Sequence, residues 1–99
     1  MKRIPPFRLV PTPLDDEARR VAGFQWADAD VGKRHQLGGE PARAISDADW
    51  PRCADCRERM TFYGQLDSIS DDICIADVGL IYVFLCFDCF DVRAIVDST

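Results

Sequence analysis

The chain has 99 residues, of which 47% are hydrophobic and 10% aromatic, and this composition excludes an intrinsically disordered protein and suits one domain over residues 1–99. The formal net charge of −5 disfavours binding to nucleic acid or to anionic membranes. No long apolar run follows the basic start at residues 1–6, so we expect a cytoplasmic protein without a secretion signal or a membrane span.

The N-terminal segment is expected to form an arm and a helix. Residues 1–12 contain two adjacent prolines and predict an extended arm, with an edge strand as one possibility. Thr12 can cap a helix that has Pro13 and three acids in its first turn, and Gly23 can end it. We therefore predict an amphipathic helix over residues 13–22, packed on a sheet through an apolar stripe of Leu14, Ala18 and Val21.

Residues 23–99 are expected to form a β-rich core. Phe24 and Trp26 alternate with polar residues as in a short strand. Gly38 and Gly39 then predict a sharp turn, and a phosphate loop is disfavoured because no Gly-Lys-Ser/Thr motif accompanies them. Further along, Ile45 and Trp50 are expected to anchor an irregular segment to the core.

Three later segments predict an antiparallel sheet. Residues 60–67 read as a strand with Met60, Phe62 and Leu66 on one face, and Gly64 marks a bulge or a close crossing. Residues 80–87 are eight consecutive apolar residues and predict a central strand buried on both faces. Residues 92–96 predict a third strand. The expected fold class is α+β, small and mainly antiparallel, with one short N-terminal helix.

Two Cys-x-x-Cys pairs are the strongest chemical signal in the chain. Cys53 and Cys56 precede one predicted strand, Cys86 and Cys89 end another, and 29 residues separate the pairs. Such a spacing is typical of a zinc ribbon, in which four thiolates surround a structural Zn²⁺ and leave no open position for catalysis. Iron fits the same ligands but is the less favoured metal. Disulfides are disfavoured by the expected reducing compartment and by the odd count of five cysteines.

Other polar residues favour structural roles. His35 could replace a cysteine ligand or act as a base, but a lone histidine beside a turn is more often structural, and a deaminase motif is absent. Cys74 is expected to be a small buried residue. Four acids lack the spacing of a calcium loop and are expected to form a solvated face: Asp67, Asp71, Asp72 and Asp77. Arginines beside the first cysteine pair could offset the charge of the site or bind phosphate: Arg52, Arg57 and Arg59.

Several of these motifs together resemble a known family. The ordered combination comprises Leu-Gly-Gly-x-Pro at 37–41, Cys-x-x-Cys at 53–56, Met-x-Phe-x-x-Gln-Leu-Asp at 60–67 and Tyr-Val-Phe at 82–84. It resembles the YwqG-like bacterial domains of unknown function, which are similar to the cysteine-rich region of programmed cell death protein 2. The resemblance implies a zinc-bearing β-rich domain that handles a protein partner. Relatives carry glycine where this chain has Arg57, so Arg57 is expected to adopt a conformation that favours glycine.

These patterns predict a binding module and no enzyme, since no nucleophile has a base beside it and no metal position is open. Residues 60–99 carry seven Asp against one Arg, and this acidic half suits a basic protein partner. We therefore expect a zinc-stabilised adaptor, chaperone-like or immunity-type module. The alternative is a nucleic-acid-binding zinc ribbon that uses the arginines near the first cysteine pair.

Overall fold

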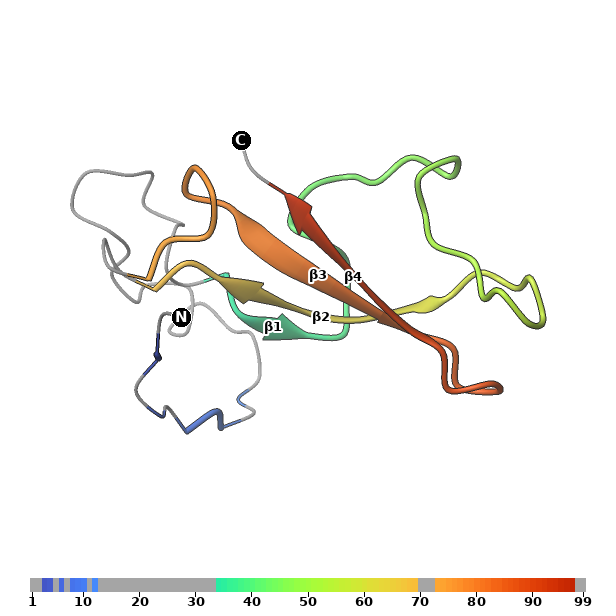
Figure 1. The fold of residues 1–99 in the computed structure, drawn as a ribbon, viewed down its shortest axis with the longest axis horizontal. Coiled ribbons are helices and arrows are strands. Elements are labelled where there is room, and N and C mark those ends of the chain that lie inside the picture. Colours follow the sequence, from blue (N-terminus) through green and yellow to red (C-terminus); the bar gives the residue numbers. More distant parts are fainter. Residues whose placement is uncertain are drawn as a thin grey trace.

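The computed structural model describes Arg3, Ile4, Pro6, residues 8–10, Thr12 and residues 34–69 and 73–97. These residues form one antiparallel sheet with the strand order β1-β2-β3-β4 (Figure 1). The strands are β1 Gln36–Leu37, β2 Thr61–Asp67, β3 Leu80–Leu85 and β4 Val92–Asp97. The three strands predicted from the sequence are thus confirmed, except that β3 ends at Leu85 and not at residue 87, because the turn of the second cysteine pair begins there. The short β1, beside the glycine turn, was not predicted.

Most of the predictions for the N-terminal segment concern residues outside the described part of the chain. The described part of the chain contains no helix, and the predicted helix at 13–22 and the strand around Phe24 and Trp26 lie outside it. The described residues of the N-terminal arm form no strand, so the predicted edge strand is not seen there. Within the described residues, no helix is long and apolar enough to cross a membrane.

The core lies on one face of the sheet and is built around the fully buried Phe84 of β3. Trp50 and Phe62 pack edge to face against its ring, with centroids 5.2 and 5.7 Å away. The Trp50 indole donates a hydrogen bond of 2.7 Å to the carbonyl oxygen of Met60, which fixes the loop before β2. Ile45 and Trp50 pack against this cluster, as predicted, and two of the four paired cysteines belong to it, Cys53 and Cys86.

A bulge in β2 changes which residues face the core. Phe62 pairs with Phe84 but Gly64 pairs with Val83, so Tyr63 is the extra residue. Gly64 also allows β1 to approach, since a Cβ there would lie 2.7 Å from a backbone oxygen of β1. Both predicted roles of Gly64 are confirmed. Beyond the bulge the alternation is reversed, and the prediction that Leu66 faces the core is wrong: it is 42% exposed.

The opposite face of the sheet, which we call the open face, is apolar but only partly covered. Along β3, Leu80, Tyr82 and Phe84 are buried whereas the intervening residues are half-buried, so the prediction of a strand buried on both faces is wrong. The open face continues through exposed Val92 and Val96 of β4. Phe87 lies beyond the end of β3 and is also exposed. The run of apolar residues in β3 therefore does not mean that both faces of this strand are buried.

Candidate metal centre

The first cysteine pair forms a tight turn with a defined hydrogen-bond pattern. The Arg57 amide donates to the Cys53 carbonyl at 2.9 Å, and the Cys53 amide donates to the Glu58 carbonyl at 2.9 Å. Arg57 closes the turn with φ of 66°, in the left-handed region that glycine enters most cheaply. The conformation expected for Arg57 from the sequence is thus confirmed.

The second cysteine pair repeats this pattern position by position. The Phe90 amide donates to the Cys86 carbonyl at 2.8 Å, and the Cys86 amide donates to the Asp91 carbonyl at 2.9 Å. Phe90, the counterpart of Arg57, has φ of 60°. The Cys89 amide also lies 3.5 Å from Cys86 Sγ and donates to it. We call these two turns, 53–58 and 86–91, the first and second knuckles.

Both knuckles lie at the same end of the sheet (Figure 1), and their thiols converge. The four Sγ atoms of Cys53, Cys56, Cys86 and Cys89 all lie within 4.8 Å of one another. Cys56 and Cys86 approach to 3.7 Å, close to the edge of about 3.8 Å that follows from Zn–S bonds of about 2.3 Å in a tetrahedron. A disulfide would need about 2.05 Å, and all five cysteines are free. The donor set and spacing therefore fit one tetrahedral metal ion.

The electrostatics of the thiols also favour a cation. A backbone hydrogen bond from Cys56 lowers the pKa of Cys53. The pKa of Cys89 is raised to about 12, mainly by its hydrogen bond with Cys53 and next by that with Cys56. A thiolate at Cys89 would be repelled by a thiolate beside it, so the protonated form is favoured. Four thiolates can therefore coexist here only when a positive ion replaces their protons. The arrangement suits zinc or iron, and the residues do not determine which.

The knuckles are joined to each other and to the core. The Ala54 amide of the first knuckle lies 3.4 Å from the Asp91 carboxylate of the second and donates to it. Cys53 and Cys86 are 1% and 5% exposed, whereas Cys56 is exposed and Cys89 half-buried. The buried cysteines make the centre an extension of the hydrophobic core, which is typical of a structural metal site.

The arginines near the first knuckle are engaged with other groups. The guanidinium of Arg59 lies 4.3 Å above the Trp50 ring and 3.7 Å from the Asp47 carboxylate. Arg52 lies 3.9 Å from the same carboxylate. These contacts provide local partners for two of the three positive charges proposed to bind phosphate.

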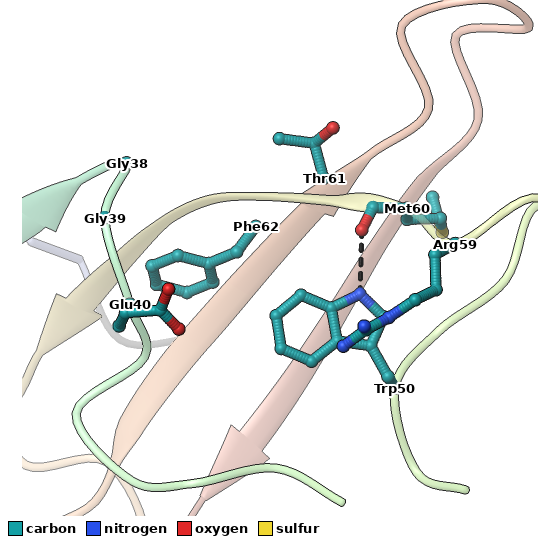
Figure 2. A pocket seen from close by; sticks show the side chains of 8 residues that line it. All are labelled: Gly38, Gly39, Glu40, Trp50, Arg59, Met60, Thr61 and Phe62. Atoms are coloured by element: carbon teal, nitrogen blue, oxygen red, sulfur yellow. Dashed lines mark hydrogen bonds between the residues drawn. The ribbon is translucent and has the colours of Figure 1, made fainter. Parts of the chain in front are cut away.

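A shallow cavity of about 570 Å³ adjoins this arginine–tryptophan stack (Figure 2). Arg59 lies against the Trp50 ring, and Phe62 faces the cavity from the other side, near Glu40. The lining residues are Gly38, Gly39, Glu40, Trp50, Arg59, Met60, Thr61 and Phe62. The only charged groups among them are the carboxylate of Glu40 and the guanidinium of Arg59, and they include no cysteine or histidine. The cavity is thus separate from the thiol cluster in its chemistry.

His35 lies outside the thiol cluster and has a structural partner. Its Nδ1 accepts a hydrogen bond of 3.0 Å from the Asp67 amide, which joins the segment before β1 to the end of β2. In this arrangement Nδ1 is an acceptor, so the neutral ring carries its proton on Nε2. Cys74 is half-buried rather than buried, and its thiol points to the Ala76 carbonyl at 3.7 Å.

Asp67 was predicted to lie on a solvated acidic face, and this prediction is wrong. Its side chain is fully buried and accepts three hydrogen bonds from Arg34, one from the amide and two from the guanidinium, at 2.8–3.0 Å. Next to it, the buried Ser68 hydroxyl donates to the Gly79 carbonyl at 2.6 Å and accepts from the Ile75 amide. A buried carboxylate paired in this way holds the sheet end opposite the knuckles and is not available to a partner. Asp71 and Asp72 lie outside the described residues.

This polar cluster of Arg34, Asp67 and Ser68 was not predicted from the sequence. Gln65 is also part of it, since its amide donates to the Arg34 carbonyl at 2.8 Å and its oxygen accepts from the Ala42 amide. The sequence does hold one indication of it. Gln65 and Asp67 alternate along β2 after Gly64, and a bulge at this glycine turns both side chains toward the core. Nothing local to β2, however, identifies Arg34 as the partner.

No protein-family model, curated protein or solved structure matches the chain significantly. The resemblance to the YwqG-like domains stays a prediction from the motifs.

Proposed function

We propose that this protein is a non-enzymatic, zinc-stabilised module that binds a basic protein partner. The observation that carries the proposal is the convergence of four thiols from two matched knuckles. A four-sulfur shell leaves no coordination position for a substrate, so the ion would serve stability. A chain of this size buries a limited core, and a structural zinc supplies on the order of 10 kcal/mol or more in small peptides.

The basic partner is supported by charge. The chain carries −5, and Zn²⁺ with four thiolates adds two further negative charges. Asp77 and Asp88 are exposed in the acidic half of the chain, and Asp88 lies on the second knuckle beside the exposed rings of Phe87 and Phe90. An acidic surface with exposed aromatic residues suits a cationic protein surface. The nucleic-acid alternative has less support, because Arg52 and Arg59 already lie near Asp47.

The metal is tested by elemental analysis of the untagged, full-length chain. We expect one zinc per chain, lost in Cys56→Ser or Cys89→Ser and retained in Cys74→Ser, whose thiol is outside the cluster. Circular dichroism and urea unfolding of the same samples would show whether metal loss accompanies unfolding. A folded wild-type protein without stoichiometric zinc or iron would refute the metal centre.

Partner binding is tested with tagged, metal-loaded chain after nuclease treatment, at low and high salt. We expect capture of a basic protein that is weakened by salt and by Asp77→Lys with Asp88→Lys, but not by Asp49→Lys, a control charge reversal in the N-terminal half. Recovery of nucleic acid that is lost on Arg52→Glu with Arg57→Glu would establish the alternative instead. Capture that ignores both sets of substitutions would refute the proposed charge complementarity.

A further inference from the structure

β4 is an outer strand of the sheet that the described residues form. It pairs with β3 in continuous register over six residues, and no other strand of residues 34–69 and 73–97 pairs with its outer side. It contains no proline, lysine or bulge, and its only charged residues that could oppose pairing with another chain are Arg93 and Asp97. Its residues alternate between the two faces, with Val92, Ala94 and Val96 on the open face and Arg93, Ile95 and Asp97 on the core face.

Among the registers that pair β4 with β4 over three residues or more, the charges on its core face are self-complementary in only one. In an antiparallel pair, residues directly opposite each other point to the same side of the sheet. Two copies of β4 therefore place their core faces on the same side only when one residue lies opposite its own copy, at the two-fold axis. An axis at Arg93 would oppose two arginines, and an axis at Ala94 would oppose Asp91 and Asp97. An axis at Ile95 places Arg93 opposite Asp97 twice, which favours this register over the other two.

Asp97 is already held in a conformation that suits a second cation. Its Oδ2 accepts a hydrogen bond of 2.7 Å from the Tyr82 hydroxyl, and its Oδ1 lies 3.5 Å from the Arg43 guanidinium. A carboxylate has about four acceptor sites, so these contacts leave room for a further guanidinium. Arg93 is exposed on the same strand.

We propose that two copies of this chain pair through β4, antiparallel and about a two-fold axis at Ile95. The pairing joins the two sheets into one and forms two Arg93–Asp97 pairs between the copies. It also places Ala94 opposite Val96 on the open face, so the apolar surfaces of both copies become continuous. Because one strand pair buries little surface, the dimer is expected to be weak and to form at micromolar or higher concentrations.

Sedimentation equilibrium of the metal-loaded chain over a range of concentrations tests the dimer. Arg93→Asp opposes acids at both sites and is expected to weaken the dimer roughly tenfold, whereas the exposed control Arg57→Asp is expected to have little effect. A mixture of Arg93→Asp and Asp97→Arg chains restores opposite charges in the heterodimer and is expected to associate more tightly than either variant alone.

Asp97→Arg also removes the contacts of Asp97 with Tyr82 and Arg43, so its folding is checked by circular dichroism. If it does not fold, hydrogen exchange of wild-type β4 replaces the mixing experiment. Alternate β4 amides are then expected to gain protection with concentration, and Arg93→Asp to abolish the gain. A chain that stays monomeric at its highest soluble concentration overturns the proposal, and so does a dimer that is indifferent to Arg93→Asp.

Discussion

Replacing Arg57 and Phe90 by glycine is expected to stabilise the metal-loaded protein. Both residues have left-handed backbone conformations, with φ of 66° and 60°, which cost an L-residue about 1–2 kcal/mol. Glycine removes this strain but adds about 0.4–1 kcal/mol of backbone entropy to the unfolded state. Phe90 is 74% exposed, so the loss of its ring sacrifices little burial. Each substitution should therefore raise the free energy of unfolding by about 0.5–1 kcal/mol.

Urea unfolding at a fixed excess of zinc measures this change, because bound metal contributes to the apparent stability. Arg57→Ala and Phe90→Ala remove the same side chains but keep the strain, and are expected to leave stability within about 0.5 kcal/mol of wild type. Asp88→Gly, in the same knuckle but without a positive φ, should destabilise. Glycine variants no more stable than the matching alanine variants would refute the assignment of strain.

Two further perturbations test the sheet. Gly64→Ala would place a Cβ 2.7 Å from the Gln36 carbonyl oxygen, so we expect a loss of roughly 1–3 kcal/mol in urea unfolding, and an unchanged midpoint would contradict the close approach. Burial and then the hydrogen bond to Asp97 raise the pKa of Tyr82 to about 12. Its raised pKa stabilises the fold below pH 10 and this contribution is lost between pH 10 and 12. Ultraviolet titration in a Tyr63→Phe background checks this, since a midpoint near pH 10 would contradict it.

The sequence predicted the features that depend on local pattern and ligand chemistry. The grouping of the four cysteines was predictable, because two Cys-x-x-Cys pairs at this spacing usually bind one metal ion together. β2, β3 and β4 were predicted to within two residues at each end, because runs of β-branched and aromatic residues favour strands. Gly64 was located correctly as a bulge or a close crossing, because glycine in a strand has few other reasons to be there.

Consequences that depend on distant residues were not predictable in the same way. A bulge reverses the alternation after it, so Leu66 faces out and Asp67 faces in, and the direction depends on how β3 pairs. The partner of Asp67 is Arg34, 33 positions earlier, and no local pattern joins them. The count of acids therefore overestimated the free negative surface.

The two ends of the sheet are held together by different physics, and this bears on how the protein would lose its structure. At one end, the buried Arg34–Asp67 pair needs no ligand and is complete within the chain. At the other end, the left-handed conformations of Arg57 and Phe90 raise the energy of the fold, and the proposed ion would supply the bonds that join the two knuckles. Because Cys53 and Cys86 are also part of the core, metal loss should disrupt the packing around Phe84 before it disturbs the ion-paired end.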